Sequence, residues 1–154
     1  MSLHIREVTK DNWRAVAALK VAPAQNEFIE SNAFSILETE IEKNGISVGL
    51  YDNETLVGYA MYGWPSPENN SAWFDRFMID HQFQGQGYAR RFMPLIFQTM
   101  QAQYGCETFY LSLHPDNLNA QKLYESFGFR LNGEVDDAGP VSGVVMEMKR
   151  NEPI

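Results

Sequence analysis

The sequence of 154 residues has no pair of cysteines for a disulfide, no signal peptide and no membrane-spanning run. It has a single cysteine, Cys106, so an internal disulfide is excluded and a reducing compartment is expected. We find no signal peptide, and no apolar run approaches the ~20 residues that a membrane span requires. Internal repeats and low-complexity linkers are absent too. We therefore expect one domain over residues 1–154, in the cytoplasm and without a membrane partner.

Positive charge is scarce. Lys and Arg together number 12 against 20 Asp and Glu, which gives a formal net charge of −8. This balance argues against nucleic acid and anionic membranes as partners. It is compatible with a cationic substrate, although acidity alone is commonly a matter of solubility. The histidines His4, His81 and His114 show no metal-ligand spacing with one another or with Cys106, so we expect no metal.

Hydrophobic periodicity predicts alternating strands and helices. Strands are expected at residues 3–8, 46–51, 55–64, 73–79, 108–113, 129–131 and 144–149. Helices are expected after Thr9, at about 31–44, at 87–103 and from about residue 117 to Gly128. In the second helix, Phe34, Leu37 and Ile41 share one apolar face. Consecutive antiparallel strands followed by a strand–helix–strand unit indicate an α/β fold, with a mixed sheet and helices on its faces.

The most informative stretch runs from Trp73 to Ala89. An aromatic-rich strand ends in Gln84-Gly85-Gln86-Gly87, and a helical pattern follows directly. Glycines let the backbone turn tightly and approach a ligand closely. The first N–H groups of a helix lack intrahelical partners, and the helix dipole favours negative charge there. A phosphate or pyrophosphate group is therefore the expected occupant of this turn.

The residues around these glycines distinguish three kinds of phosphate-binding loop. A P-loop requires Lys followed by Ser or Thr, but Tyr88 and Ala89 follow the last glycine. A dinucleotide fingerprint requires a third glycine or alanine where Arg90 stands. Gln82-x-x-Gly85-x-Gly87 instead resembles the acetyl-CoA loop of the GNAT family of N-acetyltransferases. Taken alone, the two glycines could also form an ordinary turn.

A second block strengthens the resemblance. Asn117-x-x-Ala120-x-x-Leu123-Tyr124-Glu125-x-x-Gly128-Phe129 is similar to another block of the same family, in the family's order and spacing. The resemblance covers about residues 73–131. It implies the GNAT fold, with a central, mostly antiparallel sheet, one splayed parallel strand pair and helices on both faces. It also implies a homodimer.

The resemblance implies acetyl-CoA as co-substrate. The pyrophosphate would lie on the backbone N–H groups of residues 84–89, and the pantetheine arm would run beside residues 77–79. The implied cofactor-binding residues are Phe77, Met78, Ile79, Gln84, Gly85, Gln86, Gly87, Tyr88, Ala89, Asn117 and Tyr124. For Asn117 a helix N-cap is an equally good explanation.

Two residues are expected to carry the chemistry. Tyr124 matches the family's general acid, because a tyrosine with a pKa of about 10 can protonate a departing thiolate at neutral pH. Its alternative is a core tyrosine on a short helix. Asp75 stands where polyamine-acetylating members have an acidic residue, so it could deprotonate the amine through a water. Its alternative is an ion pair with Arg76.

The acceptor is expected to be a polyamine. Several segments resemble the bacterial spermine/spermidine acetyltransferases, among them Glu27-x-Ile29-Glu30-Ser31, Trp73-x-Asp75-Arg76-Phe77 and Asn132-Gly133-Glu134. Carboxylates and aromatic faces suit a chain of ammonium groups. The expected substrate contacts are Glu27, Glu30, Tyr62, Trp73 and Asp75. Acetylation of a protein N-terminus, a lysine, an amino acid or a drug amine stays open, as does a non-catalytic acetyl-CoA-binding module.

Overall fold

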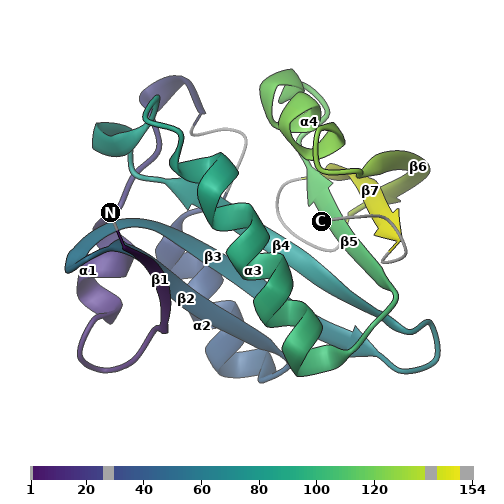
Figure 1. Cartoon of the computed structure of the whole chain (residues 1–154), viewed down its shortest axis with the longest axis horizontal. Helices are drawn as coiled ribbons and strands as arrows, with labels where there is room; N and C mark the ends of the chain where they lie inside the picture. The colour runs from purple at the N-terminus through teal and green to yellow at the C-terminus, as the bar shows by residue number, and fades with distance from the viewer. Residues whose placement is uncertain (1, 26–29, 138–141, 150–154) are drawn as a thin grey trace.

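The computed structural model describes residues 2–25, 30–137 and 142–149 (Figure 1). Its strands are β1 (Leu3–Glu7), β2 (Gly45–Asp52), β3 (Thr55–Ser66), β4 (Ser71–Ile79), β5 (Thr108–Leu113), β6 (Arg130–Asp136) and β7 (Gly143–Lys149). Its α-helices are α1 (Trp13–Ala18), α2 (Asn32–Glu42), α3 (Tyr88–Tyr104) and α4 (Leu118–Glu125). Within the described residues, no helix has the length and apolar character that a membrane crossing demands.

The strands form one mixed sheet. Its order is β1-β2-β3-β4-β5-β7-β6, with β4 and β5 parallel and every other neighbouring pair antiparallel. Helix α3 packs on one face, where Phe92, Ile96 and Phe97 join the main core. Helices α1 and α2 lie on the other face, where Val16 meets Tyr59 (Figure 1). The prediction of a mostly antiparallel sheet with one parallel pair and helices on both faces is confirmed.

The parallel pair separates soon after it starts. β4 and β5 pair only at Ser71↔Thr108, Ala72↔Phe109 and Trp73↔Tyr110. Beyond these residues β4 continues beside β3, and β5 continues beside β7. The sheet therefore opens at its centre, between the distal halves of two strands, as the resemblance implied.

A β-bulge lies at the start of this opening. Met61 pairs with Arg76 and its neighbour Tyr62 pairs with Phe74, so Asp75 is the extra residue of β4. Bulges of this kind redirect side chains and are frequent next to active sites. Here the bulge allows Asp75 and Arg76, neighbours on one strand, to line the same cavity.

Helix α2 is oriented differently from what its apolar residues suggest. It begins after Ser31, whose hydroxyl caps the helix by accepting the Phe34 N–H. Its apolar face, however, is turned to solvent, with Leu37 57% and Ile41 71% exposed. Hydrogen bonds to α1 and β2 explain this orientation, because they satisfy polar groups that the helix buries. Asn32 donates to the Val16 carbonyl at 2.9 Å, and Thr39 Oγ1 lies 2.9 Å from Ser47 Oγ.

Candidate active site

The glycine turn after β4 presents bare backbone at the start of α3. Gly85 and Gly87 have φ values of +79° and +82°, and Gly87 is the N-cap of α3 without a side-chain cap. A Cβ at Gly85 would meet nothing within 4 Å, and one at Gly87 would meet only Arg91 Nη2, at 3.7 Å, and Arg91 Nε, at 3.9 Å. The N–H groups at this helix end are therefore open to an approaching anion, which is the fit that a pyrophosphate requires.

Side chains around the turn hold its shape. Gln84 Nε2 donates to the Ile79 carbonyl and to Gln25 Oε1, both at 3.0 Å. The Tyr88 hydroxyl donates to Asp52 Oδ2 at 2.7 Å, and Arg91 Nη2 donates to the Gln86 carbonyl at 2.7 Å. The side chains of Gln84 and Tyr88 are thus engaged within the protein, so these two residues can offer a cofactor their backbone groups.

Strand β4 offers backbone groups to the opening. The Asp80 N–H donates to the Val57 carbonyl of β3, so by strand alternation the Met78 backbone also faces β3. Phe77 and Ile79 then direct their backbone groups towards the gap. The Met78 side chain is buried on the opposite face with Val16 and Tyr59. The Met78 side chain and backbone therefore both point away from the opening, and its place among the cofactor-binding residues stays a prediction.

A cavity of about 370 Å³ lies where β4 and β5 separate. Five carboxylates line it: Glu30, Glu38, Glu42, Asp75 and Asp136. Five aromatic residues line it as well: Trp64, Trp73, Phe74, Phe77 and Tyr124. Arg76 and His114 are the basic side chains of the described lining. The cavity is therefore strongly acidic and rich in aromatic rings.

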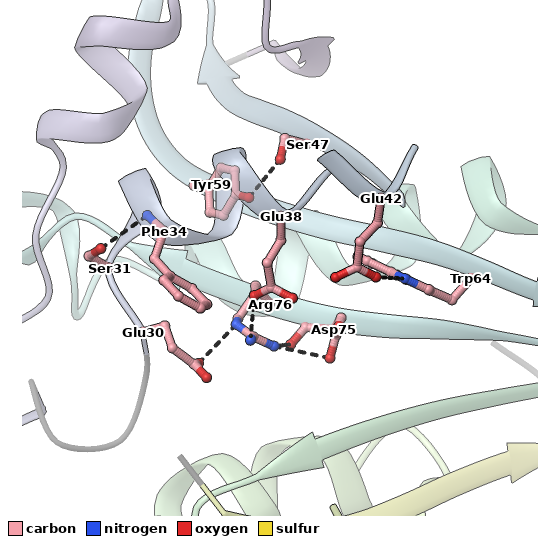
Figure 2. Close-up of polar contacts among 10 residues, drawn as sticks. All are labelled: Glu30, Ser31, Phe34, Glu38, Glu42, Ser47, Tyr59, Trp64, Asp75 and Arg76. Atoms are coloured by element: carbon pink, nitrogen blue, oxygen red, sulfur yellow. Dashed lines mark hydrogen bonds and ion pairs between the residues drawn. The ribbon is translucent and has the colours of Figure 1, made fainter. Parts of the chain in front are cut away.

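Arg76 joins three of these carboxylates (Figure 2). Its Nη1 lies 3.1 Å from Asp75 Oδ1, its Nη2 3.2 Å from Glu38 Oε1, and its Nε 3.0 Å from Glu30 Oε2. The first two contacts are hydrogen-bonded, whereas Nε has no hydrogen-bond partner among the described residues, so its contact with Glu30 is an ion pair alone. The predicted ion pair between Asp75 and Arg76 is present, and Asp75 still faces the cavity.

Burial shifts the titration of the two inner carboxyls. Desolvation raises the pKa of Asp75, and the Arg76 charge opposes this shift. The pKa of Glu38 is raised by the same two opposing effects, with desolvation the larger. Both groups are thus stronger bases than exposed carboxylates, while Arg76 limits the shift.

Tyr124 and Asn117 reach the cavity from α4. The Tyr124 ring packs edge-on against Phe74 and Phe129, with centroids 6.2 and 6.0 Å apart. Burial raises the Tyr124 pKa well above its ordinary value of 10.0, so its hydroxyl is protonated at neutral pH. Among the described residues that hydroxyl has no hydrogen-bond partner. Asn117 lines the cavity and also caps α4, because its Oδ1 accepts the Ala120 N–H at 3.3 Å.

The predicted acceptor residues have different outcomes. Glu30, Trp73 and Asp75 line the cavity. The prediction for Tyr62 is wrong, because its side chain is 3% exposed and packs in the core against Tyr104. Glu27 lies outside the described residues.

Sequence reasoning missed Glu38, Glu42 and Asp136. Glu38 and Glu42 are four residues apart on α2, so they lie on one helical face. That spacing was readable in the sequence. The sequence did not show that these residues face the site, because an amphipathic helix is expected to turn its apolar side inward, and α2 turns this polar side towards the cavity.

The open N-terminus of α3 and the splayed pair of β4 and β5 are the features that the resemblance to the N-acetyltransferases implied. The chain belongs to the Acetyltransferase (GNAT) family, whose model matches residues 7–129. It is 38% identical over 144 residues to a spermine/spermidine N(1)-acetyltransferase of Bacillus subtilis, a match that covers 90% of this chain and 95% of that protein.

Two further proteins are similar to this chain, one in its fold and one in part of its sequence. The spermidine N-acetyltransferase from Vibrio cholerae, solved in complex with CoA and spermine, has the same fold, with a TM-score of 0.76 over 97% of this chain and 96% of that one at 20% identity. A ribosomal-protein-alanine N-acetyltransferase of Haemophilus ducreyi is 41% identical over 51 residues, which cover 33% of this chain and 34% of that protein.

Proposed function

We propose that this acetyltransferase moves the acetyl group of acetyl-CoA to a primary amine of a polyamine, such as spermidine or spermine, by direct attack in a ternary complex. The observation that carries the proposal is the cavity lining of five carboxylates and five aromatic rings. A polyamine alternates ammonium groups with apolar methylene chains, and such a lining offers partners to both. The relationship to the Bacillus subtilis enzyme over nearly its whole length supports the same substrate class.

Acetyl-CoA supplies an acetyl group that is activated as a thioester, with the CoA thiolate as leaving group. The backbone N–H groups of residues 84–89 would hold its pyrophosphate at the start of α3. Phe77 and Ile79 would bind the extended arm through the backbone groups they direct into the gap, and Asn117 would contact it from α4. A backbone donor near Ile79 would stabilise negative charge that develops on the thioester oxygen.

Asp75 is the proposed general base. A primary ammonium has a pKa of about 10, so the amine arrives charged and must lose a proton before it attacks. Asp75 lines the cavity, and its carboxylate can receive that proton through a water. Burial, which raises the Asp75 pKa, makes it a better acceptor than an exposed aspartate.

Tyr124 is the proposed general acid. Its hydroxyl is protonated at neutral pH because burial raises its pKa. It reaches the cavity from α4, on the far side of the gap from β4, and would give its proton to the departing thiolate.

The outer part of the cavity would bind the distal ammonium groups. Glu42 is exposed at the C-terminal end of α2 and accepts a hydrogen bond from Trp64 Nε1 at 3.0 Å. A carboxylate beside an indole ring is a good site for an alkylammonium group. Glu30 contributes charge here although it is paired with Arg76, and Glu27 stays a prediction.

The test is an amine panel with acetyl-CoA, in which released CoA thiol is measured. We expect turnover with spermidine and spermine to exceed that with butylamine, a lysine-containing peptide and a peptide with an N-terminal alanine. Preference for the alanine peptide would support the function of the Haemophilus ducreyi relative, whose match spans 51 residues. Acetyl-CoA binding without turnover of any amine would identify a non-catalytic module. A single domain, a homodimer, a cytoplasmic location and the lack of a nucleic-acid partner stay predictions.

A further inference from the structure

The charge around Arg76 is unbalanced. Its side chain is 11% exposed and contacts carboxylates from three parts of the fold: Glu30 before α2, Glu38 within α2 and Asp75 on β4. A buried charge without a partner of opposite sign costs free energy, so a purely structural ion pair needs only one carboxylate for each guanidinium. Here three carboxylates share one guanidinium, and Glu42 and Asp136 line the same cavity. The described lining thus holds more acidic than basic side chains, which favours the entry of a cation.

Arg76 makes two hydrogen bonds to Asp75, one to its side chain and one to its backbone. Arg76 Nη1 donates to Asp75 Oδ1 at 3.1 Å and to the Asp75 backbone carbonyl at 3.0 Å. The guanidinium therefore fixes both the bulged peptide and the rotation of the carboxylate. Asp75 Oδ2 has no partner among the described residues, so one oxygen of the carboxylate stays available.

We propose that Arg76 is a positioning residue of the acceptor site, which holds Asp75 ionised and oriented so that its second oxygen can take the proton of the amine. It also keeps Glu30 and Glu38 turned towards itself, so that the incoming ammonium group is directed to Asp75. This inference rests on the proposed function, because it assumes that Asp75 receives the amine proton.

The surroundings of Asp75 make the role of Arg76 specific. The groups that share the cavity with Asp75 are Glu30, Glu38, Glu42, Asp136 and His114. All but His114 are acidic, so they disfavour ionisation of Asp75, as does its burial. Arg76 is the guanidinium that counters them. Without it, Asp75 would stay protonated up to a higher pH and would be unable to accept a proton below that pH.

The test compares Arg76→Gln and Arg76→Lys by pH profiles of kcat/KM. For Arg76→Gln we expect at least a tenfold loss at pH 7, and an acidic limb that moves to higher pH, so that activity recovers as the pH rises. Arg76→Lys keeps the charge but loses the guanidinium fork, so its limb should move less. Acetyl-CoA affinity, measured by calorimetry, should be unchanged in both. The control is Arg6→Gln, which removes an exposed ion pair between Arg6 on β1 and Glu54 in the turn after β2, and which should leave the profile as in the wild type.

A uniform loss at every pH would overturn the proposal, because it would reveal a purely structural role. An unchanged profile would overturn it as well. If Arg76→Gln fails to fold, Arg76→Gln combined with Glu38→Gln removes one charge of each sign, and a smaller shift of the acidic limb to higher pH is expected. The profiles are measured with whichever amine the wild type accepts. If the wild type acetylates another amine but not spermidine, the proposed substrate is wrong. The pH profiles of the Arg76 variants with that other amine still test the role of Arg76.

Discussion

At the scale of single residues, the adjacent residues Asp75 and Arg76 have different proposed roles. Asp75 and Arg76 would point to opposite faces of a regular strand, but the bulge brings both to one cavity. The sequence motif predicted Asp75 at the site and named Arg76 as its ion-pair partner. It could not predict that both would face the substrate side, since a bulge depends on how β3 and β4 are paired and not on local composition.

Replacement of Tyr124 by Phe tests the general acid. The ring contacts with Phe74 and Phe129 should survive, so thermal stability and acetyl-CoA affinity should stay close to wild type. The turnover number should fall by about 10², the usual effect of losing a general acid. Steady-state kinetics under conditions where chemistry limits the rate provide the measurement. Near-normal turnover would mean that water or another group protonates the thiolate.

Replacement of Glu42 by Gln tests the outer ammonium site. Exposed charge pairs contribute about 0.2–1 kcal/mol, so the KM for spermidine should rise several-fold at low salt and less at high salt. The KM for butylamine should hardly change. Glu40→Gln is the matched control, because Glu40 is exposed on the same helix and pairs with Lys43 outside the cavity. An equal effect of the two substitutions on spermidine would remove Glu42 from the site.

At the scale of elements, local sequence signals located most strands and helices, but not the direction in which α2 faces. Its apolar residues were visible in the sequence, whereas the hydrogen bonds of Asn32 and Thr39 that turn the helix over depend on distant partners, Val16 and Ser47. β6 is longer than the sequence predicted. Its residues are mostly exposed, as is usual for an edge strand, so the sequence shows little of the apolar alternation by which a strand is recognised.

The orientation of α2 gives a stability prediction with an internal comparison. Ile41 is 71% exposed on α2, and Ile96 is 0% exposed on α3. Ile96→Ala should lower the free energy of unfolding by about 2–5 kcal/mol, because it leaves a cavity in the core. Ile41→Ala should change it by no more than about 0.5 kcal/mol. Urea unfolding of both variants measures the difference, and a large loss for Ile41→Ala would show that its face is covered in solution.

The turn at the start of α3 can be tested with two matched glycines. Gly87 and Gly105 lie at opposite ends of α3, with φ values of +82° and +60°. A Cβ would meet nothing within 4 Å at Gly105 and only the Arg91 guanidinium, at ordinary contact distance, at Gly87. A valine at either position is strained, so both variants should lose some stability. Gly87→Val should weaken acetyl-CoA binding at least tenfold, about 1.4 kcal/mol, because its side chain blocks the approach to the backbone. Calorimetry should find the affinity of Gly105→Val unchanged, and the same result for Gly87→Val would refute the loop assignment.

At the scale of the whole molecule, charge and topology converge on one place. The net charge of −8 creates a field that attracts a polycation, and the cavity concentrates five carboxylates where the sheet opens. The resemblance to the family predicted the splayed pair, which periodicity alone could not reveal, since it arises from pairing between distant segments such as Ser71 and Thr108. Of the five carboxylates of the cavity, Glu30 and Asp75 were predicted at the site. Glu38, Glu42 and Asp136 were not, because they come from α2 and β6, whose placement beside β4 depends on the whole fold.

The central claim is tested most directly by comparing kcat/KM for spermidine with kcat/KM for butylamine in the wild-type protein with saturating acetyl-CoA, at low and high ionic strength. The acidic cavity predicts that spermidine is preferred at least tenfold at low ionic strength and that salt reduces this preference. Mass spectrometry should detect a singly acetylated spermidine. Equal values for the two amines, or no spermidine product, would contradict the account.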